Sequence, residues 1–571
     1  MTIREKYDMW MQKATKDADL RAELEQITGD DEAVRDRFYQ ELAFGTAGLR
    51  GVIGAGDNRM NVYVVCKATQ GLANYLNAHY DNASVAIAYD SRIKSDLFAR
   101  EAACVLAANG VTVHLYPRLA PVPLLSFAVR YCGCQAGVMI TASHNPAEYN
   151  GYKCYGADGC QMTDAAADEV TGYIRALDMF EDVKTADYDV AVADGRIRLI
   201  GDEVPEAYYE QILRQQVNPG VCAEANLKII YTPLHGAGNI PVREVLRRIG
   251  AAQVRVVAQQ ELPDGNFPTA PYPNPEIREA FNCALDMAHK EPADLILATD
   301  PDSDRVGIAV YDGEDYTLMS GNQVGCLLLD YILSCRAANG TLPKDPVVCK
   351  TIVTSNLAAA IAKKYGCELR DLLTGFKYIG EQIGLLEQKG EEDRFVFGFE
   401  ESYGYLAGAH VRDKDAVVAS MLIAEMASYY HTKGVSLLDR LQQLYAEHGV
   451  YRHSLVNVKF EGEQGMLDMR ALMDSLRQTP PAEIGGLKVL SCADYEKRER
   501  TDFVTGETVA LTLPRSNVLS YALEGNAGLI FRPSGTEPKI KAYITAIGAD
   551  LNKAIAMEET LRCEAKRIIG K

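Results

Sequence analysis

Apolar residues in this chain occur in short runs that alternate with longer segments of helical periodicity. Three such runs have the length and composition of buried strands, and they lie at 136–140, 293–297 and 394–397. Another apolar run, at 85–89, is followed by a helical stretch at 95–109 that ends at a glycine, and then by a further run at 111–116. This order of strand, helix and strand predicts βαβ units along most of the chain.

The pattern changes at the two ends. The first forty residues are charged and helical in pattern, which predicts a helical extension packed against the first domain. Beyond residue 451, alternating residues, one helix near 465–477 and later paired strands predict an α+β unit. A chain of 571 residues is long enough for about four domains at ~150 residues each. We expect boundaries that give 1–40, 41–210, 211–322, 323–450 and 451–571, with an excursion at 178–201 before the second domain.

The composition limits the possible partners. There are 59 basic and 78 acidic residues, and the resulting net charge of −19 argues against nucleic acid or an anionic membrane as a partner. The first residues contain no apolar signal segment, and the longest apolar stretch, 416–430, is interrupted by Glu425 and too short to cross a bilayer. The fourteen cysteines show no paired C-x-x-C spacing, so we expect reduced thiols and a cytoplasmic location.

The polar segment 141–146, Thr-Ala-Ser-His-Asn-Pro, is the most informative motif. It directly follows the buried run at 136–140, so that Ser143 is held at a fixed, exposed point. Lys153 lies ten residues further on and can return to that point as a cation or a proton carrier. Serine, asparagine and proline are also common turn formers, so the segment alone is consistent with an ordinary turn as well.

A second motif contains three carboxylates at alternate positions. Asp300, Asp302 and Asp304 follow the apolar run at 293–297. Neighbouring carboxylates repel one another unless a cation lies among them, and oxygen ligands from one short loop suit a hard ion such as Mg²⁺. A calcium loop is excluded because its twelfth position is Tyr311 and not a glutamate. A solvated acidic turn is the alternative, although such turns are less common directly after a buried strand.

Two further motifs contain groups that bind sugars and anions. The segment 398–404, Gly-Phe-Glu-Glu-Ser-Tyr-Gly, carries Glu400 and Ser402, which can bond vicinal sugar hydroxyls, but its composition is also typical of a solvated surface. The segment 531–538, Phe-Arg-Pro-Ser-Gly-Thr-Glu-Pro, combines Arg532 with hydroxyls and backbone N–H groups that can surround a phosphate. Its alternative interpretation is a turn between two strands.

These four segments, in this order, resemble the phosphoserine, metal, sugar and phosphate loops of the α-D-phosphohexomutases. The resemblance extends from about Phe44 to the C-terminus, and the segment 44–51 is most similar to the bacterial α-phosphoglucomutase branch, which is related to the animal phosphopentomutase type. The resemblance implies an α/β fold in which three similar α/β domains with mixed sheets and a C-terminal α+β domain surround a central cleft.

The resemblance also implies roles for individual residues. Ser143 carries the phosphoryl group and binds Mg²⁺ together with Asp300, Asp302 and Asp304. Lys153 is either the general acid/base or only an electrostatic clamp, His144 positions the phosphoserine, and Arg50 is a further cation near the reacting phosphate. The expected substrate-binding residues are Arg305, Thr374, Gly375, Glu400, Ser402, His410, Lys414, Arg532, Ser534, Gly535 and Thr536.

The implied reaction is that of a phosphoglucomutase, which interconverts α-D-glucose 1-phosphate and glucose 6-phosphate. It passes through a phosphoserine enzyme and glucose 1,6-bisphosphate, which is also the activator. A phosphopentomutase, a phosphomannomutase and a sugar-bisphosphate synthase are alternatives, whereas a non-catalytic sensor is disfavoured because Ser143 and the three aspartates are intact. Glucose is the favoured sugar of the substrate because Glu400-Glu401-Ser402 resembles the glucose-type loop. The oligomeric state, the regulation and the role of the first forty residues stay open.

Overall fold

The computed structural model describes residues 1–45, 48–460, 462–534 and 539–570. Three short helices begin the chain: α1 (Ile3–Lys13), α2 (Ala18–Gln26) and α3 (Asp31–Phe38). The first is closed by a capping box between Thr2 and Glu5, which satisfies amide groups at its N-terminus. The chain's single tryptophan, Trp10, is completely buried and donates its indole N–H to Asp57 Oδ1 at 2.8 Å. The predicted helical extension is therefore docked on the first domain.

The first domain contains a six-stranded mixed sheet in the order β1-β5-β4-β2-β3-β6. Its strands are β1 (Gly48–Val52), β2 (Ser84–Tyr89), β3 (Thr112–Leu115), β4 (Ala136–Ile140), β5 (Tyr149–Gly156) and β6 (Ile197–Leu199). Its helices are α4 (Val62–His79), α5 (Ser95–Ala108), α6 (Val122–Tyr131), α7 (Asp164–Arg175) and α8 (Tyr188–Ala193). The stretch 178–201, which we expected to be an excursion, instead completes this sheet, because β6 pairs in parallel with β3.

The second domain has a five-stranded sheet in the order β11-β10-β9-β7-β8. Its strands are β7 (Lys228–Thr232), β8 (Gln253–Val256), β9 (Leu295–Thr299), β10 (Val306–Tyr311) and β11 (Tyr316–Met319). Its α-helices are α9 (Glu203–Leu213), α10 (Val221–Ala225), α11 (Asn239–Arg248), α12 (Ala258–Glu261) and α13 (Asn282–Lys290).

The third domain has a four-stranded sheet in the order β13-β12-β14-β15. Its strands are β12 (Val347–Thr351), β13 (Glu368–Leu372), β14 (Phe395–Glu400) and β15 (Gly404–Ala407). Its α-helices are α14 (Gly321–Ala338), α15 (Leu357–Lys364), α16 (Phe376–Glu387), α17 (Ala416–His431) and α18 (Leu437–His448).

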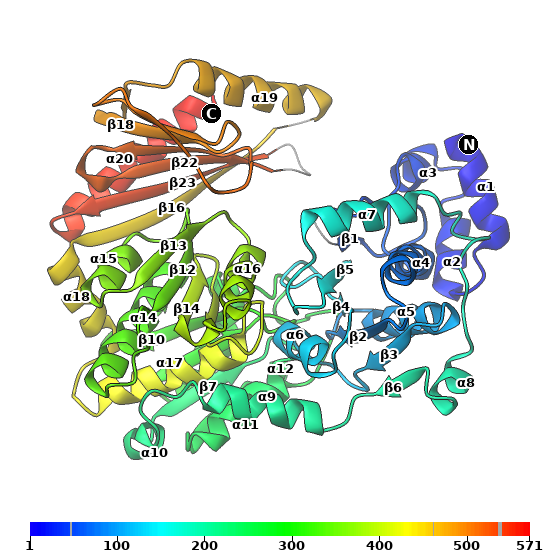
Figure 1. The fold of residues 1–571 in the computed structure, drawn as a ribbon, viewed down its shortest axis with the longest axis horizontal. Coiled ribbons are helices and arrows are strands. Elements are labelled where there is room, and N and C mark those ends of the chain that lie inside the picture. Colours follow the sequence, from blue (N-terminus) through cyan, green and yellow to red (C-terminus); the bar gives the residue numbers. More distant parts are fainter. Residues whose placement is uncertain (46–47, 461, 535–538, 571) are drawn as a thin grey trace.

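The fourth domain is built on an antiparallel sheet with the path β16-β23-β22-β21-β18-β19-β20 (Figure 1). Its strands are β16 (Val450–Lys459), β17 (Glu483–Ile484), β18 (Leu487–Asp494), β19 (Glu499–Asp502), β20 (Thr508–Ala510), β21 (Leu519–Leu523), β22 (Gly528–Pro533) and β23 (Lys539–Gly548). Its α-helices are α19 (Gly462–Gln478) and α20 (Leu551–Ile569). The expected order of three α/β domains followed by an α+β domain is confirmed.

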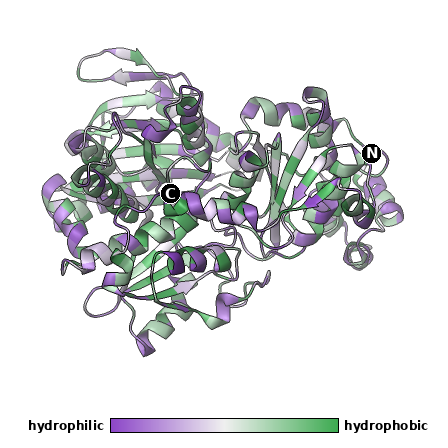
Figure 2. Ribbon diagram, turned by 60° about the horizontal axis from the view of Figure 1, so that its bottom comes forward, coloured by the Kyte–Doolittle hydropathy of each residue, from purple (hydrophilic) through white to green (hydrophobic). Residues whose placement is uncertain are grey.

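Burial follows the hydrophobic pattern. Figure 2 shows mostly hydrophobic strands in the α/β sheets, surrounded by helices that alternate between hydrophobic and hydrophilic residues. The apolar stretch that we identified at 416–430 forms α17, which is buried along nearly its whole length. The Glu425 carboxylate that interrupts this stretch accepts hydrogen bonds from Val217 N, Asn218 N and the Tyr331 hydroxyl. Among the described residues, no helix is both long enough and apolar enough to cross a membrane.

The three α/β domains place their motifs at equivalent positions. Each motif loop joins a parallel strand to the antiparallel strand beside it: β4 to β5, β9 to β10, and β14 to β15. Each loop also contains one non-glycine residue with left-handed backbone, namely Ser143 (φ 52°), Ser303 (φ 50°) and Tyr403 (φ 66°). Such conformations cost free energy and cluster at functional sites, so the repeated turn directs attention to these three loops.

Candidate active site

Ser143 lies at the junction of the first two domains. The residue is 6% exposed, and its Oγ donates a hydrogen bond to Asp300 Oδ2 at 2.8 Å. His144 Nδ1 lies 3.2 Å from the same Oγ, and burial followed by the positive charge of Arg305 holds the pKa of His144 well below its usual value. An uncharged imidazole therefore lies beside the serine hydroxyl, and the positioning role of His144 stays a prediction.

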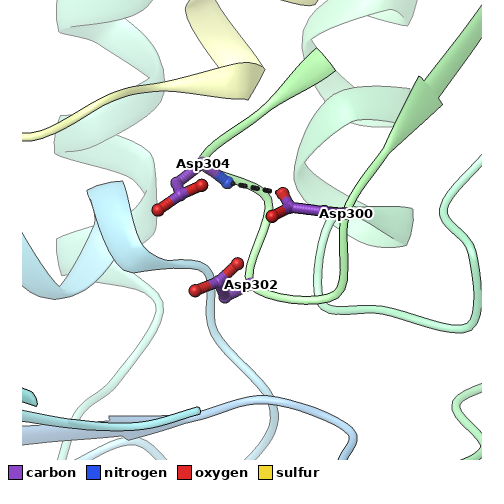
Figure 3. Close-up of side chains that lie close together, drawn as sticks. All are labelled: Asp300, Asp302 and Asp304. Carbon is purple, nitrogen blue, oxygen red and sulfur yellow. Dashed lines mark hydrogen bonds between the residues drawn. The ribbon is translucent and has the colours of Figure 1, made fainter. Parts of the chain in front are cut away.

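The three aspartates of the second domain form a compact cluster that can hold a metal ion. Figure 3 shows them around the turn after β9, with the Asp304 backbone N–H donating to Asp300 Oδ1 at 3.1 Å. One carboxylate oxygen from each lies within 4.8 Å of the others, and all three residues are buried. Asp302 Oδ1 and Asp304 Oδ1 have no hydrogen-bond partner among the described residues. Because buried carboxylate oxygens need compensation, this donor set fits a hard divalent cation.

The pKa values of the three aspartates also favour a bound cation. Burial, and then the charges of Asp302 and Asp304, hold the pKa of Asp300 well above its ordinary value. Three adjacent carboxylates cannot all ionise without positive charge beside them. Burial acts to raise the pKa of Asp302, but Lys153 outweighs burial and lowers it, whereas the pKa of Asp304, like that of Asp300, is raised. A divalent cation would add the further positive charge that lets Asp300 and Asp304 also act as charged ligands.

Lysine and arginine side chains from three domains surround the aspartates. Lys153 Nζ, from β5, lies 2.9 Å from Asp302 Oδ2 and 3.9 Å from Asp304 Oδ2. Lys414 Nζ approaches Asp304 Oδ2 at 3.1 Å, and Arg305 Nε lies 3.8 Å from Asp304 Oδ1. Burial lowers the pKa of Lys153, but the attraction of the two aspartates outweighs burial and leaves it raised. Lys153 is therefore a protonated, positively charged group in this arrangement.

Two helices approach the aspartate loop with their N-terminal ends. At the start of α6, Val122 N donates to Asp302 O at 2.9 Å, and at the start of α17, Ala416 N donates to Ser303 O at 3.3 Å. The positive ends of helix dipoles stabilise nearby negative charge. The loop of the second domain is thus held by the first and third domains, which also deliver Ser143 and Lys414.

The sugar motif lies at the end of β14. Glu400 is buried, and its Oε1 accepts a hydrogen bond from Gly375 N at 2.9 Å, which brings together two residues that we predicted separately. Burial and the neighbouring Glu400 raise the pKa of Glu401 to about 7. Ser402 and Thr374 are half-buried in the adjoining loops. The predicted sugar-binding groups therefore lie around one pair of carboxylates.

The phosphate motif begins on β22, where Arg532 pairs with Lys541 of β23. Ser534 N donates to Lys539 O at 2.8 Å, whereas Gly535 and Thr536 lie outside the described residues. Burial and the Glu401 carboxylate raise the pKa of Tyr543, a neighbour on β23, to about 12, and Arg532 opposes that rise. This face of the fourth domain therefore lies within electrostatic reach of the sugar motif.

Two predicted residues form no hydrogen bond or ion pair with the three aspartates in the described part of the chain, although the charge of Arg50 contributes to lowering the pKa of His144. Arg50 is exposed on β1, opposite Gly151 of β5, on the strand pair that also carries Lys153. His410 Nε2 is 2.9 Å from Asp415 Oδ2, and Asp415 in turn caps the N-terminus of α17. The structure does not place His410 beside the other site residues, so its contact with substrate stays a prediction.

Sequence reasoning missed two carboxylates that hold the cations of the site. Asp413 Oδ1 accepts from Lys414 Nζ at 2.9 Å, and Glu276 Oε1 accepts from Arg305 Nη1 at 2.5 Å. The pattern Asp-Lys-Asp at 413–415 is a local signal that could have revealed the first of these. Glu276 is far from Arg305 in sequence and gives no such signal.

Known proteins resemble this chain over most of its length. Residues 41–180, 206–313 and 320–448 match, in turn, the alpha/beta/alpha domains I, II and III of the phosphoglucomutase/phosphomannomutase family. A phosphoglucomutase of Staphylococcus haemolyticus is 38% identical over 510 residues, which cover 89% of this chain and 91% of the relative. A phosphoglucomutase of Staphylococcus aureus strain RF122 is 37% identical over 540 residues, covering 94% and 95% of the two chains.

Solved structures share the fold. Parafusin (phosphoglucomutase) from Paramecium, in its open form, superposes with a TM-score of 0.69 at 16% identity, covering 93% of this chain and 95% of that one. A phosphoglucomutase/phosphomannomutase family protein from Burkholderia thailandensis gives a TM-score of 0.65 at 17% identity, covering 92% and 97%. Domain matches, full-length relatives and fold agree, and the chain therefore belongs to the phosphoglucomutase/phosphomannomutase family, the α-D-phosphohexomutases.

Proposed function

We propose that this protein interconverts α-D-glucose 1-phosphate and glucose 6-phosphate through a phosphoserine at Ser143 and a glucose 1,6-bisphosphate intermediate. The observation that carries the proposal is the 2.8 Å hydrogen bond from Ser143 Oγ to Asp300 in a buried, triply acidic loop. This contact supports the proposal, because phosphoryl transfer depends on positioning the reacting oxygen and neutralising charge, and the serine hydroxyl lies beside carboxylates that could hold a metal ion. Glucose is proposed as the sugar because the full-length relatives are phosphoglucomutases.

Asp300, Asp302 and Asp304 would hold Mg²⁺ together with the phosphorylated Ser143 side chain. When bound, the ion neutralises negative charge on the transferring phosphoryl group as a Lewis acid. The surrounding cations add to this effect, since Lys153 and Lys414 already lie within 3.1 Å of Asp302 and Asp304 respectively. The negative net charge of the chain makes such local cations necessary for attracting an anionic substrate.

Each half-reaction transfers one phosphoryl group and one proton between Ser143 and the sugar. In the first, the bond between Ser143 Oγ and phosphorus breaks while the free sugar hydroxyl forms a new oxygen–phosphorus bond. We assign Lys153, protonated at rest, to give a proton to the departing serine oxygen and to recover one from the sugar hydroxyl. In the second, the other phosphate of the bisphosphate returns to Ser143 by the same steps in reverse.

The sugar must bind in two orientations, so the non-reacting phosphate needs one constant site. We assign that site to Arg532, Ser534, Gly535 and Thr536, and we assign Glu400 and Ser402 to the sugar hydroxyls in both poses. The four motif loops are assigned to domains at 41–210, 211–322, 323–450 and 451–571. All fourteen cysteines are free thiols, which supports our placing the reaction in the reducing cytoplasm.

Initial rates on glucose, mannose, N-acetylglucosamine and ribose 1-phosphates at matched concentration test the proposal directly. Glucose 1-phosphate should give the highest kcat/KM, and a preference for ribose or mannose 1-phosphate would replace it with one of the alternative mutases. Mass spectrometry should find phosphate on Ser143, Ser143→Ala should lose several orders of magnitude of activity, and EDTA should abolish turnover until Mg²⁺ is restored. Full activity of Ser143→Ala would refute the mechanism. Turnover that requires an outside phosphoryl donor would indicate a bisphosphate synthase instead.

A further inference from the structure

A buried arginine in the first domain contacts the Ser143 loop and has no role in the scheme above. Arg92 belongs to the segment Asp90-Ser91-Arg92, which directly follows β2. Because β2 pairs in parallel with β4, with Tyr89 opposite Ile140, the segment emerges at the same sheet edge as Ser143. Arg92 is only 2% exposed, which is unusual for a charged side chain without a specific partner.

The Arg92 guanidinium lies 3.5 Å from Asp90 Oδ2 through its Nε, and its hydrogen-bond acceptors are backbone carbonyls at and after Ser143. Its Nη1 donates to Pro146 O at 2.8 Å and to Tyr149 O at 2.9 Å, while its Nη2 donates to Ser143 O and Asn145 O. One guanidinium thus binds three carbonyls of the loop and that of Tyr149, the first residue of β5. A lysine has the same charge but lacks the planar fork needed to reach all four.

The other side of the Ser143 backbone is held by a carboxylate from the same segment. Asp90 Oδ2 accepts from the Thr141 hydroxyl at 2.6 Å, and that hydroxyl accepts from Ser143 N at 2.8 Å. Asp90 Oδ1 accepts from Arg92 N at 3.0 Å and from the Ser95 hydroxyl at 2.9 Å. Both the N–H and the carbonyl of Ser143 are therefore fixed from the turn after β2. This support matters because Ser143 has φ 52°, a costly conformation for a residue with a Cβ.

Arg92 also contacts the domain that supplies the metal ligands. The ring of Phe267, from the second domain, lies with its centroid 5.0 Å from the guanidinium carbon, and Phe267 is completely buried. Beside it, a β-carbon added to Gly265 would lie only 2.5 Å from Ile93 N, so the two backbones are in direct contact. The guanidinium is thus held between the Ser143 loop of the first domain and a loop of the second.

We propose that Arg92 is a positioning residue for phosphoryl transfer, which holds the Ser143 loop in its strained turn and aligns it, through Phe267, with the Asp300 loop. The inference rests on the proposed function, because the benefit of the alignment is transfer between Ser143 and the sugar. Misplacing a reacting atom by about 1 Å costs on the order of 100-fold in rate. The sugar and phosphate motifs lie on the third and fourth domains, away from Arg92, so substrate binding should change little.

The test compares Arg92→Ala with wild type and with Arg100→Ala. Arg100 is a matched control because it is exposed and stacks on Tyr188 in the same domain, with its guanidinium carbon 4.2 Å from the ring centroid. In Arg92→Ala, kcat should fall about 100-fold with KM within about threefold of wild type. Phosphorylation of Ser143 by stoichiometric glucose 1,6-bisphosphate, followed in a quench-flow experiment, should slow by the same factor. Low millimolar guanidinium should restore part of kcat in Arg92→Ala alone.

Each outcome decides between positioning and a merely structural role. Unchanged kcat and phosphorylation rate in a folded Arg92→Ala variant would overturn the proposal, as would a loss confined to thermal stability. If Arg92→Ala does not fold, Phe267→Leu and Arg92→Lys replace it. Both should show the same fall in kcat without a matching rise in KM, and normal kinetics in both would overturn the proposal. A wild-type enzyme without sugar-phosphate turnover in the same assay would instead refute the proposed function.

Discussion

Replacing Lys414 with methionine should expose the charge balance of the aspartate cluster. Lys414 Nζ lies 2.9 Å from Asp413 Oδ1 and 3.1 Å from Asp304 Oδ2. Burial alone would lower the pKa of Lys414, but the attraction of these two carboxylates is stronger and raises it. Its aliphatic chain packs against Gly404, where an added β-carbon would be 2.2 Å from Lys414 Cδ. Methionine keeps much of that packing and removes only the positive charge.

The expected loss of folding free energy depends on which cations remain near Asp304 when Lys414 is replaced. Removing one partner of a buried ion pair costs about 3–5 kcal/mol, because the other charge is left uncompensated. Asp304 still keeps Lys153 at 3.9 Å and Arg305 at 3.8 Å, so we expect the lower end, about 3 kcal/mol. For a unit of 150 residues or more, this corresponds to roughly 6–12 °C in the midpoint of its thermal transition.

Differential scanning calorimetry with and without Mg²⁺ measures this effect. A divalent cation bound at the aspartates supplies the missing positive charge, so Mg²⁺ should raise the midpoint of Lys414→Met more than that of wild type. Lys433→Met, at an exposed lysine on the same domain, is the matched control and should leave the midpoint unchanged within about 1 °C. Equal midpoints for Lys414→Met and wild type in EDTA, or an equal response to Mg²⁺, would refute the electrostatic reasoning.

Three further results are expected. Lys153→Arg keeps the positive charge, but a guanidinium does not readily release a proton near neutral pH. If Lys153 transfers protons, kcat should therefore fall ~100-fold or more, whereas retained activity would show that Lys153 is only an electrostatic clamp. Arg532→Ala should lower kcat/KM by about 10- to 100-fold with partial rescue by added glucose 1,6-bisphosphate, and Arg532→Lys should recover only part; kinetics identical to wild type would remove the phosphate-site assignment. Burial, followed by Lys350 and Arg452, lowers the pKa of His453 to about 4 from 6.5. The unfolded chain then binds the proton first as pH falls below 6.5, so stability is lost between pH 6.5 and 4, by up to about 2 kcal/mol at pH 5. Urea unfolding should show a flatter pH dependence for His453→Gln, and an unchanged slope would contradict this.

The sequence predicted the elements whose signal is local. The run at 136–140 is β4 at the same bounds, and the helix expected at 95–109 is α5, because buried strands and capped helices carry their own pattern. By contrast, β6 has only three residues, two of them exposed, and therefore shows no hydrophobic signal. Pairing with β3 creates this strand, and such pairing is not visible in a single sequence.

For the site, too, local features could be predicted from the sequence and long-range contacts could not. Ser143 and the aspartates could be identified because each motif follows a strong strand signal, but their mutual arrangement could not. Lys153 meets Asp302 across 149 residues of sequence, and the hydrogen bond from Ser143 to Asp300 spans 157. Such contacts depend on how folded domains pack, which leaves no periodicity in the chain. The same reason explains why Arg92, whose contacts also form only in the fold, was not identified from the sequence.

The buried Trp10 gives the native chain a fluorescence donor at a single defined position. This indole is the only one in the sequence, and it is buried on α1, which lies beside the first domain (Figure 1). At the other end, Cys563 of α20 is an exposed thiol, whereas the remaining cysteines are buried or half-buried. A thiol-reactive energy acceptor attached there would pair with Trp10 fluorescence across the molecule. The separation between the first and fourth domains can then be followed as each sugar phosphate enters and leaves, with no engineered residue.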